Sequence, residues 1–406
     1  GIYWFKPEFE KYTKDLKNAE VLIIVTAAHN GFSNPQAEFA KQKGFNILSH
    51  GQAVGEFMEG TIFNREFVGV SVAGAHGKTT IAAMMAASLV DLVRDPTYTI
   101  GTSEIFPIGF GGHFGKGDYF IAEADEYFSV LYIDRKPKFL YQNPTYLIIN
   151  NIDFDHPDVY KNLEEVKYAF KQFANTDSIK TVFVSDDEKL RDLIPEIDKE
   201  IVLYGKSSNC DYRLSDFQEI GSGSVFCVFQ KEIPIGEFRL SVPGIHNALN
   251  ALSVIALMSE IGIHPDDISV SLQKFEGTKR RLEKIGQNSQ GIIIYDDYAH
   301  HPKEIETTLE ALKLAYPLKL ITVIFQPHTY SRTESLMEDF SKAFRVADTT
   351  IILPIFASAR ENTTDEEKAR ISQVLKDKLP MAHFLETNES VVEYVNRNTK
   401  SDSIIV

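Results

Sequence analysis

The stretch that decides the fold is Val68–Met85, which reads VGVSVAGAHGKTTIAAMM. Its apolar start is typical of a buried β-strand, and the small and apolar residues from Ile81 onward predict a helix. Gly74 and Gly77 lie between the two, so the chain passes through a glycine turn from a strand directly into a helix. This order of elements predicts an α/β fold built on a parallel sheet.

The same turn has the composition of a phosphate-binding loop. Backbone N–H groups of a glycine turn can close around an anion, and the positive end of the helix adds to the attraction. Lys78 would neutralise a nucleotide's terminal phosphates, and the Thr79 hydroxyl would hold Mg²⁺. Only two residues separate the glycines, whereas the general motif has four, so a plain helix cap is the alternative. The predicted loop residues are Gly74, Ala75, His76, Gly77, Lys78, Thr79 and Thr80.

The overall composition restricts the class of protein. A chain of 406 residues is long enough for about three domains. Its 57 acidic and 42 basic residues give a net charge of −15, which argues against binding nucleic acid or an acidic membrane surface. Cys210 and Cys227 lack the spacing of a metal or redox motif. Because no apolar run has the length of a membrane span, we expect a cytoplasmic protein without membrane insertion.

The order of predicted elements divides the chain into three segments. Residues 1–66 lack the strand and glycine turn that normally open a parallel α/β sheet, so we expect an incomplete N-terminal domain. Residues 67–278 alternate strands with helices, and residues 279–406 repeat that pattern. The predicted linker between them is Gly277–Lys279. An antiparallel β patch is expected from Cys210 to Val242.

Acidic and polar residues follow two predicted strands of the central segment. Glu123 opens the string EADE directly after an apolar strand, and NNIDFDH, which ends at His156, follows the next one. The carboxyl ends of parallel strands form the edge where nucleotides bind. A solvated acidic turn and an ordinary loop histidine are the alternatives. Mg²⁺ prefers oxygen ligands, so a metal role for His156 needs independent support.

A second group of candidates lies further along the chain. Polar side chains occupy the first turn of an otherwise apolar helix that is expected from about His246 to Ile261. An Arg-Arg pair lies at the predicted junction. The strings DDYAHHP (296–302) and FQPHTYSRT (325–333) each end a strand and therefore project from one sheet edge. A single helix is expected over 331–344. The candidates are His246, Asn247, Asn250, Arg281, Asp297, Tyr298, His300, His328 and Arg332.

Together these strings resemble those of the Mur ligases, the ATP-dependent amide-bond enzymes of peptidoglycan synthesis. The matching strings are AGAHGKTT (73–80), EADE (123–126), NIDFDH (151–156), PGIHNALNA (243–251), KRRLE (279–283), DDYAHHP and FQPHTYSRT. They run in family order over nearly the whole chain. The resemblance implies a three-domain architecture: a partial UDP-sugar-binding domain (1–66), a P-loop ATPase domain (67–278) and a Rossmann-like amino-acid domain (279–406).

The resemblance also implies a role for each candidate. Those expected to act on phosphate or metal are Lys78, Thr79, Glu123, His156 and Arg281. The metal ligands among them would be Thr79, Glu123 and His156. Those expected beside the adenosine are His246, Asn247, Asn250 and Asp297. Those expected to bind the amino acid are Tyr298, His300, His328 and Arg332.

FQPHTYSRT favours the branch of the family that joins L-alanine to the lactyl carboxylate of UDP-N-acetylmuramate, using ATP and Mg²⁺ and releasing ADP and phosphate. One alternative is the branch that adds a recycled tripeptide to the same sugar nucleotide, which Glu126-Tyr127 and Asp134–Lys136 also resemble. Another is a P-loop nucleotide-binding protein without ligase activity. Thr329 departs from the family, because several members carry Arg there.

Overall fold

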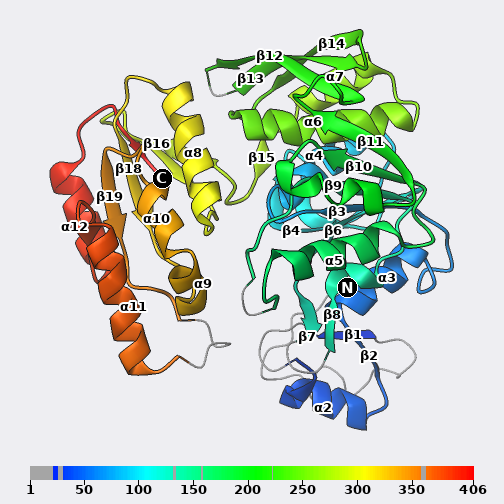
Figure 1. Cartoon of the computed structure of the whole chain (residues 1–406), viewed down its shortest axis with the longest axis horizontal. Helices are drawn as coiled ribbons and strands as arrows, with labels where there is room; N and C mark the ends of the chain where they lie inside the picture. The colour runs from blue at the N-terminus through cyan, green and yellow to red at the C-terminus, as the bar shows by residue number, and fades with distance from the viewer. Residues whose placement is uncertain (1–21, 26–30, 131–133, 157–158, 222, 358–362) are drawn as a thin grey trace.

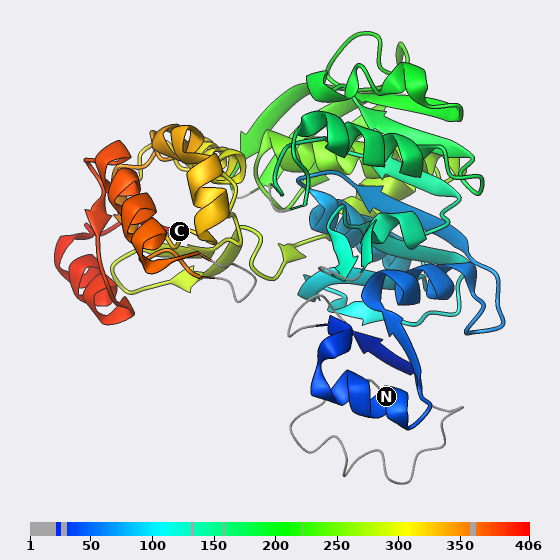
Figure 2. The ribbon, with the colours of Figure 1, turned by 60° about the horizontal axis from the view of Figure 1, so that its bottom comes forward.

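The computed structural model describes residues 22–25, 31–130, 134–156, 159–221, 223–357 and 363–406. A central body contains an eleven-stranded sheet, and a C-terminal body with a six-stranded sheet lies beside it (Figure 1). A small N-terminal unit projects from the far end of the central body (Figure 2). No helix within these ranges is long and apolar enough to cross a lipid bilayer.

The central sheet has the order β14-β13-β12-β11-β10-β9-β3-β6-β4-β15, and β5 pairs with β4. Neighbours from β12 to β4 run parallel. β12, β13 and β14 form an antiparallel meander, which confirms the expected β patch. The strands are β3 (Val68–Ala73), β4 (Thr97–Phe106), β5 (Gly109–His113), β6 (Tyr119–Ala124), β9 (Tyr146–Ile149), β10 (Thr181–Ser185), β11 (Glu200–Gly205), β12 (Tyr212–Ile220), β13 (Gly223–Gln230), β14 (Ile233–Leu240) and β15 (Gly277–Thr278).

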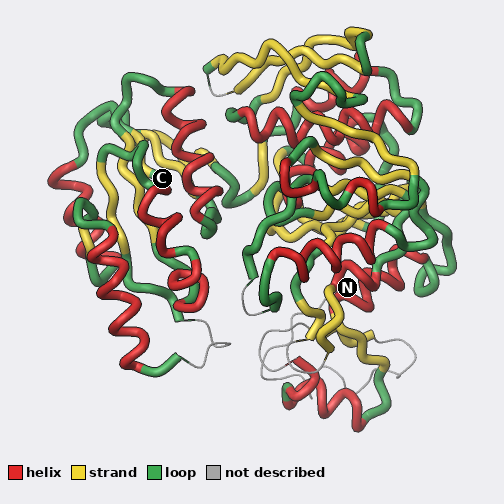
Figure 3. The backbone as a smooth tube through the Cα atoms, in the orientation of Figure 1, coloured by secondary structure: helices red, strands yellow, loops and turns green. Residues whose placement is uncertain are grey.

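Helices cover both faces of this sheet (Figure 3). Ile148 of β9 belongs to the core formed with α4 (Lys78–Asp91), α6 (Ile245–Glu260) and α7 (Pro265–Gln273). Its neighbours Leu147 and Ile149 pack instead in the core that contains α5 (Leu163–Ala174). Successive side chains of a strand point to opposite faces, so a strand covered on both sides is apolar throughout. This explains the unbroken apolar runs of the central segment.

The C-terminal body repeats the layered arrangement. Its sheet has the order β16-β17-β21-β18-β19-β20, in which β16 alone is antiparallel to its neighbour. Its strands are β16 (Glu283–Gln287), β17 (Ile293–Asp296), β18 (Ile321–Phe325), β19 (Thr349–Ile352), β20 (His383–Phe384) and β21 (Ile404–Ile405). Its helices are α8 (Pro302–Ala315), α9 (Tyr330–Ser335), α10 (Met337–Ala343), α11 (Asp365–Lys378) and α12 (Asn388–Asn398).

The N-terminal unit is joined to the central body through a hairpin. β1 (Leu22–Val25) pairs in parallel with β2 (Asn46–Ser49), and α2 (Pro35–Gln42) and α3 (His50–Glu59) complete the unit. The hairpin consists of β7 (Phe128–Val130) and β8 (Asp134–Pro137). The Ser129 hydroxyl donates a hydrogen bond to the Ser49 hydroxyl at 2.6 Å. The hairpin therefore holds the start of α3 against the central body.

The linker differs from the expectation. Gly277 and Thr278 form the edge strand β15, which pairs with Phe106 and Ile105 of β4. Two of the three predicted linker residues are therefore part of the central sheet, and the chain leaves that sheet only after Thr278. The boundaries of the three domains stay a prediction.

The helix expected over 331–344 is divided into α9 and α10. The break lies at Leu336, whose φ of −109° is not helical. The hydroxyl of Ser335 donates to the carbonyl of Arg332 at 3.1 Å. Such side-chain bonds to the backbone compete with regular helix formation.

Phe139, in the short 3-10 helix Lys138–Tyr141, offers a test of the packing against α5. Its side chain is 0% exposed and stacks on Phe173 with ring centroids 4.7 Å apart. We expect Phe139→Ala to lower the free energy of unfolding by about 3–5 kcal/mol, because a large buried ring is replaced by a cavity. Urea denaturation measures it. The control is Phe110→Ala, whose ring is 81% exposed and should change stability by less than about 0.5 kcal/mol. Similar losses in both variants would contradict this account of the core.

Candidate active site

The predicted phosphate loop connects β3 to α4. Gly77 caps α4 with a φ of +85°, in the left-handed region that favours glycine. A Cβ atom at Gly77 would lie 2.6 Å from Asn150 Nδ2 and 2.7 Å from Asn250 Oδ1. Asn151 accepts the His76 N–H at 2.8 Å, and the amide groups of Asn150 and Asn151 each donate to the His76 carbonyl at 3.0 Å. The loop is thus held in place by the polar string that follows β9.

Lys78 lies at the base of this loop, with its side chain only 14% exposed. Its ammonium group donates to the Gly74 carbonyl at 2.5 Å and to Glu126 Oε2 at 3.0 Å. Burial opposes the charge of Lys78, but Glu126 and the other carboxylates of the EADE string raise its pKa above the ordinary value. Burial would also raise the pKa of Glu126, yet Lys78 and His156 bring it below the usual range. Lys78 and Glu126 therefore form a buried ion pair.

Thr79 and Glu123 form a second contact between the loop and the end of β6. The Thr79 hydroxyl donates to Glu123 Oε2 at 3.1 Å, and the Gly101 N–H donates to Glu123 Oε1 at 2.6 Å. Burial raises the pKa of Glu123, although Gly101 and Lys78 oppose that rise. A hydroxyl and a carboxylate side by side are the oxygen ligands that Mg²⁺ prefers. These two residues fit a magnesium ion at the phosphate loop.

His156 lies beyond Glu126. Its Nε2 is 3.5 Å from Glu126 Oε1 and 3.7 Å from Asp155 Oδ2. Burial lowers the pKa of His156, but these two carboxylates raise it above its ordinary value. A protonated imidazole has no lone pair for a metal. The protonated form of His156 would therefore have to lose its proton before the ring could become a metal ligand.

Two cavities flank the loop. The first, here called the loop cavity, has a volume of about 550 Å³. The predicted residues that line it are His76, Gly77, Thr80, His246, Asn247, Asn250, Arg281 and Asp297. The second, here called the junction cavity, has a volume of about 950 Å³ and lies between the central and C-terminal bodies. The predicted residues that line it are Lys78, Glu123, His156, Asp297, Tyr298, His300, His328 and Arg332. Gly74, Ala75 and Thr79 are not among the residues lining either cavity.

The first turn of α6 supplies one wall of the loop cavity. Burial lowers the pKa of His246 to about 4, so its ring is neutral at pH 7. Asn247 donates to the Pro243 carbonyl at 2.7 Å, whereas Asn250 accepts from Asn150 at 3.1 Å. The two amides therefore have different structural partners, one within the helix start and one in the phosphate-loop network.

The junction cavity has a wall of aromatic side chains from the C-terminal body. The rings of Tyr298 and His300 have centroids 5.3 Å apart, and those of His300 and His328 are 6.5 Å apart. Phe356 extends this wall by stacking on His328 at 5.4 Å. Arg332 Nε lies 3.1 Å from Asp155 Oδ1 of the central body. Strings from both bodies therefore meet in one cavity.

Four residues of this arrangement are absent from the predicted site. Glu126 and Asp155 belong to strings that the sequence singles out, but nothing in the strings shows which carboxylate meets Lys78 or Arg332. Glu304 lies three residues after His301, and this spacing is typical of a capping box. No local signal indicates Phe356, because only the fold brings it to His328.

Comparisons with known proteins agree with these findings. Residues 72–258 match the Mur ligase middle domain, and residues 280–406 match the Mur ligase, glutamate ligase domain. The UDP-N-acetylmuramate–L-alanine ligase of Desulfitobacterium hafniense is 36% identical over 95% of this chain and 82% of its own length. That of Caldanaerobacter subterraneus is 35% identical over 96% and 81%.

Solved structures show the same architecture. The UDP-N-acetylmuramate–alanine ligase of Thermotoga maritima superimposes with a TM-score of 0.74 at 26% identity, covering 97% of this chain and 82% of that one. A murein peptide ligase of Psychrobacter arcticus, at 22% identity over 95% and 82%, shares the fold with a TM-score of 0.67. The two domain matches and the near full-length relatives lead to one conclusion: the chain belongs to the Mur ligase family.

Proposed function

We propose that this protein is an ATP-dependent ligase that joins L-alanine to the lactyl carboxylate of UDP-N-acetylmuramate in the synthesis of a peptidoglycan precursor. The observation that carries the proposal is the junction cavity, where Lys78 of the phosphate loop and Arg332 of the C-terminal body line the same space. The names of the relatives at 35–36% identity support this choice of substrates. Because ATP and nucleotide sugars are cytoplasmic metabolites, the enzyme would act in the cytoplasm.

The first step would be phosphoryl transfer. A lactyl carboxylate oxygen attacks the γ-phosphorus of ATP, and the bond from this phosphorus to the β-phosphate oxygen breaks. The products of this step are an acyl phosphate and ADP. Lys78 would bind the phosphates, and Arg281 would reach them from the junction. Mg²⁺, held by Thr79 and Glu123 and with His156 as the candidate ligand for a second ion, would neutralise charge on the phosphoryl group. His246, Asn247, Asn250 and Asp297 would orient the adenosine in the loop cavity.

The second step would be aminolysis. The amino group of L-alanine forms a bond to the acyl carbon, and phosphate leaves. His300 is suited to accept the proton that the amine loses, because burial lowers its pKa and leaves the ring neutral. Its Nδ1 lies 3.0 Å from the Tyr298 carbonyl and would donate to it, which leaves the lone pair on Nε2. Arg332 would bind the α-carboxylate of L-alanine.

Phosphate release tests the proposal against its alternatives. We expect release with ATP, UDP-N-acetylmuramate and L-alanine together. Release only with the tripeptide L-alanyl-γ-D-glutamyl-meso-diaminopimelate as amine donor would indicate the tripeptide ligase. Nucleotide binding without release for either donor would indicate a P-loop protein without ligase activity.

Lys78→Ala should abolish phosphate release while the protein stays folded. The variant loses the buried cation of the loop, whose charge-assisted bond contributes roughly 1.5–3 kcal/mol to binding and more in the transition state. Turnover and circular dichroism are the measurements. Lys274→Ala is the control, because its ammonium pairs with Asp91 at 2.7 Å on the protein surface. A folded Lys78→Ala protein with wild-type turnover would exclude the phosphate-loop role.

Glu123→Ala and His156→Ala test the metal ligands. Each should lower turnover and raise the Mg²⁺ concentration that gives half-maximal activity, since each would remove a ligand from a metal that stabilises the transferring phosphate. A titration of activity against Mg²⁺ measures both effects. An unchanged Mg²⁺ titration for His156→Ala would indicate that His156 is not a metal ligand and only pairs with Glu126 and Asp155.

Arg332→Lys tests the amino-acid site. We expect the KM for L-alanine to rise at least about tenfold, equal to roughly 1.4 kcal/mol, because an ammonium cannot reproduce two parallel hydrogen bonds to a carboxylate. The KM values for ATP and UDP-N-acetylmuramate should change little. Arg370→Lys is the matched control, since Arg370 pairs with Glu334 on the surface at 2.5 Å. An equal rise for all three substrates would instead indicate that Arg332 acts through Asp155 on the whole junction.

A further inference from the structure

Glu304 lies in the first turn of α8 and makes two different sets of contacts. Its Oε2 accepts the backbone N–H groups of His300 and His301 at 3.1 and 3.3 Å, which is the carboxylate half of a capping box. This bond fixes the turn that carries His300 into the junction cavity. Helix capping therefore accounts for Oε2 but leaves Oε1 unexplained.

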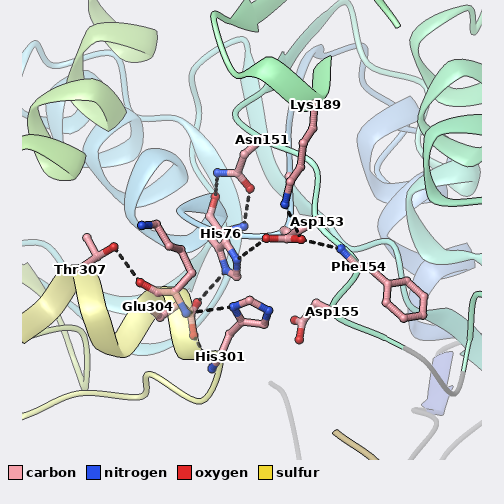
Figure 4. A network of polar contacts seen from close by, with 12 residues as sticks. His76, Asn151, Asp153, Phe154, Asp155, Lys189, His301, Glu304 and Thr307 are labelled. Atoms are coloured by element: carbon pink, nitrogen blue, oxygen red, sulfur yellow. Dashed lines mark hydrogen bonds and ion pairs between the residues drawn. The ribbon is translucent and has the colours of Figure 1, made fainter. Parts of the chain in front are cut away.

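Glu304 Oε1 faces His76 of the phosphate loop and Arg281 at the junction between the two bodies. It lies 3.2 Å from His76 Nδ1 and 3.6 Å from Arg281 Nη1. Figure 4 shows His76 between Glu304 of α8 and Asp153 of the central body. Burial would raise the pKa of Glu304, but the His76 ring and the Arg281 guanidinium hold it well below its usual range. One ionised carboxylate thus contacts His76 of the phosphate loop, Arg281, and the backbone of the turn that carries His300.

His76 is suited to transmit this contact. Its backbone is fixed by Asn150 and Asn151, and burial of its ring is outweighed by Asp153 and Glu304, which raise the pKa of His76 to about 9. The ring is therefore a cation at neutral pH. A positive side chain of the phosphate loop is paired across the junction with a negative side chain of the C-terminal body.

The same cluster has the composition of a metal site, because ligand atoms of His76, Asp153 and His301 lie within 4.8 Å of one another. The hydrogen bonds argue against that use. His301 Nδ1 accepts the Lys303 N–H at 3.2 Å, so the proton of the neutral ring is on Nε2. His301 Nε2 consequently has no lone pair for a metal unless the cap of α8 is given up.

We propose that Glu304 is a positioning residue that couples the phosphate loop to the aromatic wall of the junction cavity, through His76 on one side and the turn of His300 on the other. The inference rests on the proposed ligase function. Glu304 also holds Arg281 at 3.6 Å, so a phosphate at the loop competes with it for the guanidinium group. When Arg281 moves to phosphate, Glu304 retains His76, and the C-terminal body stays aligned with the nucleotide loop.

A double-mutant cycle tests this coupling. Glu304→Gln keeps an acceptor for the His300 and His301 N–H groups but removes the charge, and His76→Ala removes the opposite partner. We expect each to lower kcat/KM for L-alanine about tenfold, and the double variant to show about the same tenfold loss, because both remove one shared contact. ATP affinity, measured by calorimetry without the other substrates, should change less than about threefold in Glu304→Gln, because Glu304 belongs to the C-terminal body and not to the phosphate loop.

Two control variants distinguish the loss of coupling from the general effects of weakening a helix cap and of removing a paired histidine. Glu367→Gln changes the same capping box on α11, where Glu367 accepts the Thr364 N–H at 2.8 Å. His113→Ala breaks a histidine–carboxylate pair with Asp95, at 2.8 Å, within the central body. Both should keep kcat/KM within about twofold of wild type.

The outcomes are distinct. An additive loss of about hundredfold in the double variant would overturn the coupling while leaving the ligase function in place. A wild-type protein without phosphate release would overturn the function itself. Stoichiometric zinc that survives dialysis and disappears in His301→Ala would assign the cluster to a metal and overturn the coupling. Non-additive losses with unchanged controls would support it.

Discussion

The charge of Lys78 is the constraint on which the junction depends. A buried cation costs several kcal/mol unless a partner compensates it, and Glu126 does so at 3.0 Å. Glu126 then faces His156 at 3.5 Å, His156 faces Asp155 at 3.7 Å, and Asp155 faces Arg332 at 3.1 Å. Carboxylates thus alternate with Lys78, His156 and Arg332 from the phosphate loop to the C-terminal body. The two bodies are joined here by a row of charges, with each cation in contact with a carboxylate.

This row has a consequence for an enzyme whose substrates are anions. In the proposed reaction, a phosphate would compete with Glu126 for Lys78, and a substrate carboxylate would compete with Asp155 for Arg332. Binding would then exchange one anion for another and would not have to neutralise a bare cation. The cations are already fixed in place, and fixed charges stabilise a transition state without the cost of reorganisation. A carboxylate that loses its cation must find another partner, such as a metal or a histidine. In the proposed reaction, substrate binding and domain alignment would thereby be linked.

The sequence predicts the features that depend on neighbouring residues, such as strands, turns and helices. It does not predict which side chains from distant parts of the chain come into contact. Strand, turn and helix of Val68–Met85 occur as expected. The amino-acid candidates line the junction cavity, and the adenosine candidates line the loop cavity, although Asp297 borders both. Strand ends at one sheet edge are predictable because the parallel order fixes them. The partners of individual charges are not, since Glu123 and Glu126 are chemically alike in EADE. Phe356 and Glu304 reach the site only through the packing of the C-terminal body.

Thr329 shows why such a site is also difficult to infer from the conformational preferences of individual residues. Its φ of +68° is a conformation that a β-branched residue rarely adopts, and strain of this kind costs about 1–3 kcal/mol. The surrounding contacts enforce it: the Thr329 N–H donates to the Phe356 carbonyl at 3.0 Å, and the Phe356 N–H donates to Pro327 at 2.8 Å. The Thr329 hydroxyl caps α9 by accepting the Arg332 N–H. Backbone strain at Thr329 is thus retained where it fixes the start of α9, the helix that carries Arg332. The conformational preference of a β-branched residue is overridden here by the contacts that position this arginine.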